Sequence, residues 1–194
     1  NISIEISEVA VKRNKTEYEM NKFDALVSMI KLALMRGQKT LIYFPTVSLI
    51  NRFYDYCYSK DLNNYVVRYH GQMDAAAKNE GFQSFLSCQK MVMLATKAFG
   101  MGIDIPDIVI VSHFSPTGNV CDYMQEIGRA ARDENIQGHA IYQHMSNDFK
   151  HINRLHGLSA IQRYQLVEVI KKILEIYMHT RYKNNGRQLT KKRN

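Results

Sequence analysis

Residues 90–114 read KMVMLATKAFGMGIDIPDIVIVSHF, and this stretch decides the fold. Two almost wholly apolar runs, 90–96 and 107–114, flank a loop with two glycines and a carboxylate. Short apolar runs of this kind are typical of parallel strands that are buried on both faces of a sheet. Ligands of open parallel sheets bind where the strands end, so the loop after the first run is a candidate binding segment.

The rest of the sequence continues this alternation of strands and helices. Asp74 is a predicted helix N-cap, and Gly37 is a predicted helix stop. The pattern predicts an α/β domain with an open, mostly parallel sheet flanked by helices, at residues 1–158, and a C-terminal helix with a basic tail at 159–194. Further strands are expected at 2–11, 40–44, 65–70 and 139–144, and helices at 22–35, 47–59, 75–87, 121–131 and from 146.

The charge, the cysteines and the apolar runs of the sequence limit which kinds of partner we expect. The 194 residues carry a net charge of +8, which favours nucleic acid first and an acidic membrane surface second, although a basic tail can simply aid solubility. Three widely spaced cysteines indicate neither a zinc site nor a disulfide framework, which fits a reducing compartment. The apolar runs are too short to span a membrane, so we expect no membrane partner. The first residue is not Met, and we expect a fragment or a processed product.

Residues 125–134, QEIGRAARDE, contain the arginines that are candidates for phosphate binding. On a continuous helix, Gln125, Arg129 and Arg132 would share one face. The arginine fork suits phosphate, and an arginine finger in nucleotide hydrolysis is worth about 10³–10⁵ in rate. The alternative is a surface network with the acidic residues of the same stretch.

The glycine loop is a weaker signal. Its glycines allow close backbone approach to a ligand, Asp104 can accept from a ribose hydroxyl, and Thr96 can donate to a backbone phosphate. Taken alone, this pattern also fits a tight turn. The chain has neither a GxxxxGK[ST] phosphate loop nor an acidic cluster for Mg²⁺. We therefore expect the arginines to serve a nucleotide that another domain binds.

Taken together, these stretches resemble the second RecA-like domain of superfamily 2 helicases, and most closely that of the RecQ family. ATKAFGMGIDIPD resembles motif V and YMQEIGRAARD resembles motif VI, and the two together are highly specific. LIYFPT resembles motif IV, and YHGQM resembles a loop that reads Tyr-His-Ala-Gly-Leu in the family. The resemblance covers residues 1–150 and implies an ATP-dependent, 3′-to-5′ DNA helicase, cytoplasmic in bacteria or nuclear in eukaryotes.

The resemblance also implies roles for individual residues. Arg132 would be the main arginine finger, with Arg129 and Gln125 beside it, and Gly102 and Asp104 would face the nucleotide. ATP and Mg²⁺ would be held mainly by an N-terminal RecA-like domain of the same polypeptide. Single-stranded or partly duplex DNA would be contacted through its backbone at Thr46, His70, Gly71 and Thr96.

Two features depart from the family pattern. Ala131 stands where the family usually has Gly, and no cysteine follows Cys121, so residues 159–194 are not the family's zinc module. Two other functions stay open. One is an RNA helicase or remodelling translocase, although Gln125 stands where DEAD-box enzymes usually have His. The other is a non-enzymatic module whose arginines bind only a polyanion.

Overall fold

A computed structural model of the chain describes residues 1–9, 15–99, 104–145, 147–148 and 171–172. The chain divides into two compact units, Asn1–Leu155 and His156–Asn194. The second unit is described only at the helical residues 171–172. The predicted C-terminal helix and tail otherwise lie outside the described residues, as does most of the helix expected from residue 146, and the boundary after residue 158 stays a prediction.

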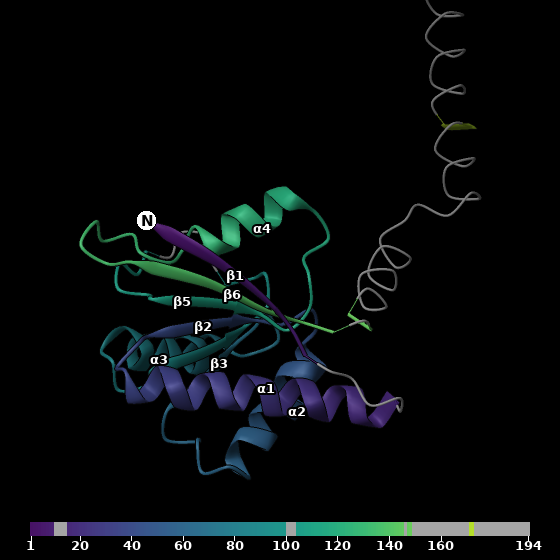
Figure 1. Cartoon of the computed structure of the whole chain (residues 1–194), viewed down its shortest axis with the longest axis horizontal. Coiled ribbons are helices and arrows are strands. Elements are labelled where there is room, and N and C mark those ends of the chain that lie inside the picture. Colours follow the sequence, from purple (N-terminus) through teal and green to yellow (C-terminus); the bar gives the residue numbers. More distant parts are fainter. Residues whose placement is uncertain (10–14, 100–103, 146, 149–170, 173–194) are drawn as a thin grey trace, which may run out of the picture. The chain divides into compact units, whose positions relative to one another are not determined.

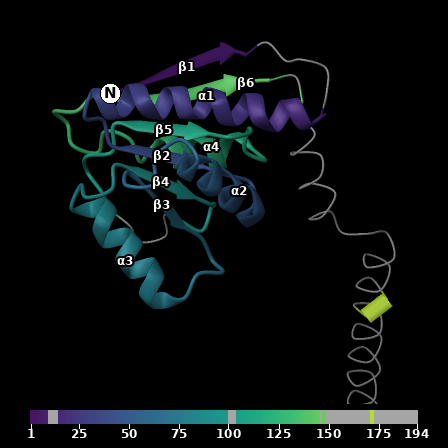
Figure 2. The same ribbon diagram turned by 90° about the horizontal axis from the view of Figure 1, so that it is seen from below.

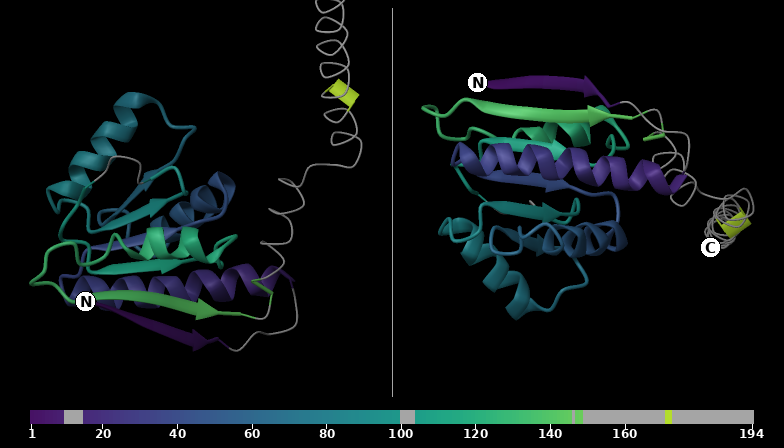
Figure 3. Two further views of the ribbon diagram at one scale, coloured as in Figure 1. Left: turned by 90° about the horizontal axis from the view of Figure 1, so that it is seen from above. Right: turned by 60° about the horizontal axis from the view of Figure 1, so that its bottom comes forward.

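A six-stranded sheet forms the centre of the first unit. Its order is β1-β6-β5-β2-β4-β3, and every neighbouring pair is parallel. Figure 3 shows β1 at one edge of the sheet beside β6. The predicted α/β fold with a parallel sheet is thus confirmed. The strands are β1 (Ile2–Glu8), β2 (Thr40–Tyr43), β3 (Val66–Tyr69), β4 (Val92–Ala95), β5 (Ile110–His113) and β6 (Gly138–His144).

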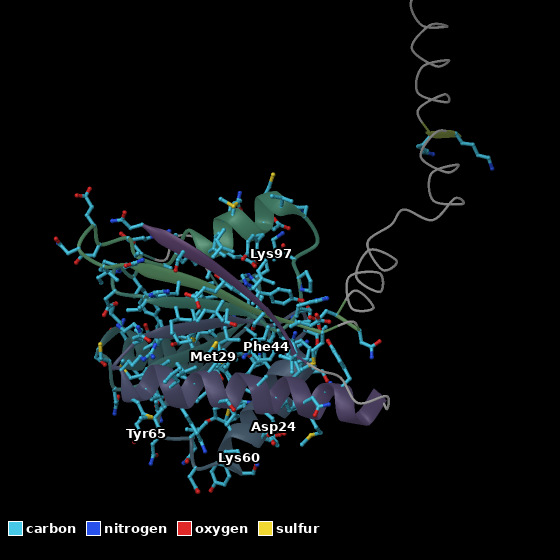
Figure 4. All side chains as sticks on the ribbon, viewed as in Figure 1. Asp24, Met29, Phe44, Lys60, Tyr65 and Lys97 are labelled. Atoms are coloured by element: carbon cyan, nitrogen blue, oxygen red, sulfur yellow. The ribbon has the colours of Figure 1, made fainter. Side chains whose placement is uncertain are left out.

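Helices cover both faces of the sheet. Figures 1 and 2 show α1 on one face, and Figure 1 shows α4 on the other. In β2, Ile42 faces a core shared with α1 and α2, whereas Leu41 and Tyr43 face a second core shared with α3 and α4. Figure 4 labels Phe44 and Met29, which both belong to the first core. The helices are α1 (Lys15–Met35), α2 (Val47–Tyr58), α3 (Ala75–Leu86) and α4 (Val120–Ile127).

Two predicted helix-end residues, Gly37 and Asp74, have the expected roles in the structure. Gly37, two residues after the end of α1, adopts a left-handed φ of 64°, a conformation that favours glycine. Asp74 caps α3, and its carboxylate accepts a hydrogen bond of 2.8 Å from the Ala77 N–H.

The end of α4 differs from the prediction. A continuous helix was expected to residue 131, but α4 ends at Ile127 and a turn begins at Gly128. The Ala131 N–H donates to the carbonyl of Ile108 at 2.8 Å instead of continuing the helix ladder, and its φ is 52°. A hydrogen bond to the segment before β5 therefore overrides local helix propensity.

Candidate nucleotide and nucleic-acid sites

The turn after α4 brings two predicted site residues together. Arg132 donates from a guanidinium N–H to the Asp104 carboxylate at 2.6 Å. Asp104 precedes β5 by six residues, so this contact joins the glycine loop to the arginine stretch. The Arg132 side chain is 37% exposed and that of Asp104 is 79% exposed. Both groups remain accessible to a ligand.

Backbone contacts hold this turn on the segment before β5. Besides the Ala131–Ile108 bond, the Asp133 N–H donates to the Pro106 carbonyl at 3.2 Å. The first residue of β6 allows this packing, because a Cβ on Gly138 would lie 2.9 Å from the Cβ atoms of both Ala130 and Ala131. The small residues thus set how closely the arginine stretch approaches the sheet.

The side chain of Arg129 contacts the sheet at β2. It is half-buried, and its guanidinium interacts with the hydroxyl of Tyr43. That hydroxyl donates in turn to the carbonyl of Phe99 at 3.2 Å. Burial raises the pKa of Tyr43, and the positive charge of Arg129 opposes this rise. The phenol therefore stays neutral and can both accept and donate.

The predicted shared helical face is wrong. Gln125 is exposed on α4, whereas Arg129 and Arg132 lie on the turn beyond the helix. Gly102 lies outside the described residues.

The other group of predicted residues follows the ends of three neighbouring strands. Thr46 follows β2, Thr96 follows β4, and His70 and Gly71 follow β3. Because the strands are parallel, these residues share the carboxyl edge of the sheet. The Thr96 N–H donates to the Tyr69 carbonyl at 3.4 Å, which extends the β3–β4 ladder into this edge.

These edge residues differ in accessibility. Thr46 and Gly71 are exposed, and Thr96 is half-buried. The Thr46 hydroxyl caps α2 by accepting from the Leu49 N–H at 3.3 Å. His70 is only 6% exposed, and burial lowers its pKa, with Arg68 and Lys78 adding to the effect. A neutral, buried imidazole offers no charge to a phosphate, so the threonines and Gly71 are the better candidates for contact.

A small pocket of about 100 Å³ lies at the same edge. The consecutive strands β4 and β5 lie on opposite sides of β2, and the pocket lies between the loops that follow these two strands. Ligands of open parallel sheets commonly bind at such a point. Lys97, labelled in Figure 4, and Asp122 line it and form an ion pair of 2.5 Å. Its floor contains Tyr43, His113 and Glu126.

Sequence reasoning missed the buried pair in this floor. The His113 Nε2–H donates to the Glu126 carboxylate at 2.8 Å, and both residues are under 10% exposed. A histidine near the end of the apolar run 107–114 predicts a buried polar partner, because a buried imidazole requires one. The identity of that partner could not be read, since it depends on how α4 packs on β5.

The described part of the chain contains neither a cluster of metal-binding side chains nor a helix that could span a membrane. No three side chains of the types that bind metals lie together there. Among the helices that the structure describes, none has the length and apolar character needed to cross a membrane.

Comparison with known proteins agrees with this architecture. Residues 21–134 match the family model of the helicase conserved C-terminal domain. ATP-dependent DNA helicase Q-like 5 of Arabidopsis thaliana is 33% identical over 139 residues, which are 66% of this chain and 15% of that protein. The putative DEAD-box ATP-dependent RNA helicase 51 of Oryza sativa subsp. japonica is 24% identical over 166 residues, which are 81% of this chain and 27% of that protein.

A solved structure shares the fold. The second domain of the DEAD-box helicase Mss116p, bound to an RNA duplex, superposes with a TM-score of 0.60 at 19% identity, over 82% of this chain and 60% of that one. The chain spans less than a third of the length of each curated relative above. With a family model that matches more than half of its residues, the chain belongs to the helicase conserved C-terminal domain family.

Proposed function

We propose that this chain is the second motor domain of a RecQ-like, ATP-dependent DNA helicase that moves 3′ to 5′. ATP and Mg²⁺ are held mainly by an N-terminal RecA-like domain of the same polypeptide. The observation that carries the proposal is the placement of Arg132 on Asp104, with Arg129 anchored beside it, in a chain without a phosphate loop of its own.

The arginine stretch fits a nucleotide that approaches from outside. Arg132 is paired but partly exposed, so its guanidinium can exchange Asp104 for a phosphate oxygen. Arg129 lies on the same turn, and Gln125 is exposed on the preceding helix, α4. ATP supplies the phosphoryl group that is transferred to water. This chain's part is to place positive charge where negative charge develops.

The carboxyl edge fits a nucleic-acid backbone. Thr46, Gly71 and Thr96 follow the ends of adjacent strands and carry hydroxyl or peptide N–H groups that can donate to phosphate oxygens. Contacts of this type carry no base information, so we expect little sequence preference. Opening and closing of the cleft between the two domains would then move single-stranded nucleic acid along this edge.

An RNA substrate is the second candidate. A relative named as an RNA helicase aligns with 81% of this chain, and the structural neighbour described above holds an RNA duplex. The DNA proposal is favoured by the higher identity, 33%, to a relative named as a DNA helicase.

The test is ATP hydrolysis by the full-length protein with no nucleic acid, with single-stranded DNA and with single-stranded RNA, beside its Arg132→Ala variant. We expect DNA to stimulate turnover and the variant to lose at least about 10³-fold in rate while it still binds ATP. Stimulation by RNA alone would select the second candidate. Normal turnover in Arg132→Ala would overturn the assigned role of this arginine, and rapid hydrolysis by this chain alone would overturn the two-domain proposal.

A further inference from the structure

A chain of polar contacts connects the two groups of candidate residues. The Thr96 carbonyl accepts from the Phe99 N–H at 2.9 Å. The Phe99 carbonyl accepts from the Tyr43 hydroxyl at 3.2 Å, and the Arg129 guanidinium interacts with the same hydroxyl. One phenol therefore joins the loop after β4 to the turn after α4.

A second route reaches the same turn through the buried pair. The Tyr43 ring stacks on His113, with centroids 5.4 Å apart and an interplanar angle of 22°. His113 donates to the Glu126 carboxylate at 2.8 Å. The Glu126 carbonyl then accepts from the Arg129 N–H at 3.3 Å. Glu126 thus contacts His113 through its carboxylate and the backbone N–H of Arg129 through its carbonyl.

We infer that Tyr43, His113 and Glu126 are positioning residues that hold Arg129 at a fixed place relative to Thr96, so that contact at the carboxyl edge changes how well the arginines are aligned. The inference rests on the proposed function. It goes beyond that function because it assigns the link between the two sites to three residues that belong to neither.

Burial makes these residues suitable for this role. Tyr43 and His113 are 4% and 3% exposed, and buried hydrogen bonds that polarise one another resist rearrangement. A shift of the loop that begins at Thr96 moves the Phe99 carbonyl, and the Tyr43 hydroxyl must follow it or lose its acceptor. Simple core packing would instead depend on the rings and not on the hydroxyl.

The first test is Tyr43→Phe in the full-length protein, which keeps the ring and its stack and deletes only the hydroxyl. We expect kcat for nucleic-acid-stimulated ATP hydrolysis to fall about tenfold, as for loss of a hydrogen bond to a charged group. KM for ATP and the affinity for nucleic acid should stay within about twofold. An unchanged kcat, or a loss confined to KM, would overturn the inference.

The matched control is Tyr123→Phe. The Tyr123 ring also packs on His113, with centroids 5.2 Å apart, but its hydroxyl takes no part in the chain of polar contacts described above. We expect its kinetics to match the wild type. Equal losses in both variants would assign the effect to general packing and would count against the inference.

Glu126 provides a rescue experiment. Glu126→Ala removes the acceptor of His113 and should lower kcat about tenfold, whereas Glu126→Gln keeps an acceptor oxygen and should restore most of it. Equal loss in both variants would contradict positioning by this hydrogen bond. Urea midpoints of each variant show that the fold persists.

Failure of the inference can be told apart from failure of the proposed function. If Arg132→Ala is inactive but Tyr43→Phe is normal, only the positioning role is lost. If the wild-type protein shows no turnover stimulated by DNA or RNA, the proposed function is wrong and the inference is overturned with it.

Discussion

The carboxylate of Asp148 is expected to be a main anchor of the first unit, and Asp148→Asn is the change that tests this. Asp148 and Lys22 are both fully buried and form an ion pair of 2.7 Å. The carboxylate also accepts from the hydroxyls of Tyr18 and Tyr142 and, at 3.0 Å, from the Met145 N–H. Asparagine keeps the shape of this group but removes the charge that balances Lys22.

The size of the loss can be bounded from the chemistry of Lys22. Breaking a buried ion pair at one partner typically costs about 3–5 kcal/mol. In the folded variant, Lys22 can become neutral by releasing its proton, because burial already lowers the pKa of this amine from 10.5. Releasing that proton at pH 7 costs about 4.8 kcal/mol, since each pH unit corresponds to about 1.36 kcal/mol. The loss should therefore lie between about 3 and about 5 kcal/mol.

This mechanism gives the loss a pH dependence. Near pH 9 the unfolded chain still protonates Lys22, but releasing the proton costs only about 2 kcal/mol. The free energy of unfolding of the variant should thus approach that of the wild type as the pH rises. The assay is urea denaturation of both proteins near pH 7 and near pH 9.

A surface pair provides the control. Asp122→Asn breaks the ion pair with Lys97, whose side chain is 69% exposed, and should cost less than about 1 kcal/mol at either pH. A loss below about 1 kcal/mol for Asp148→Asn, or an equal loss at both pH values, would refute the reasoning.

Three further predictions concern the same unit. The wild type should lose stability as the pH falls below about 4, because hydrogen bonds from Lys22, Tyr142 and Tyr18 outweigh burial and lower the pKa of Asp148 from 3.8. Acid titration followed by circular dichroism measures this loss. Asp148→Asn should lack the part of the loss that comes from protonation of Asp148. Gly138→Ala should cost about 1–3 kcal/mol in thermal denaturation, because its Cβ would lie 2.9 Å from two alanine Cβ atoms. Ala131→Gly should be neutral or stabilising by up to about 1 kcal/mol, since φ is 52° there, and a loss of about 1 kcal/mol, as in a helix interior, would contradict that geometry.

The fold could be predicted from the sequence because its signals are local. The apolar runs that became β2, β4 and β5 were each assigned as strands, and Gly37 and Asp74 act at the helix ends where the sequence placed them. Alternation of strands and helices then leaves a parallel sheet as the solution. The location of Thr46 and Thr96 along one edge follows directly from that topology.

The arginine turn could not be predicted by the same reasoning. Helix periodicity placed Arg129 and Arg132 on one helical face, but the end of α4 is decided by the Ile108 carbonyl, which lies 23 residues before Ala131 in the sequence. Likewise, the buried partners Lys22 and Asp148 are 126 residues apart, and no local pattern pairs them.

The departure at Ala131 has a physical meaning that the sequence alone did not supply. The RecQ resemblance implies Gly at this position, and the left-handed φ of 52° is a conformation that favours Gly, because a Cβ costs about 1–2 kcal/mol in this region. The chain nevertheless holds Ala there with a hydrogen bond to Ile108 on one side and Gly138 against its Cβ on the other. The backbone path that carries Arg132 to Asp104 is therefore set by tertiary contacts strong enough to overcome the preference of an alanine, and the position of this arginine depends on the sheet rather than on the helix that precedes it.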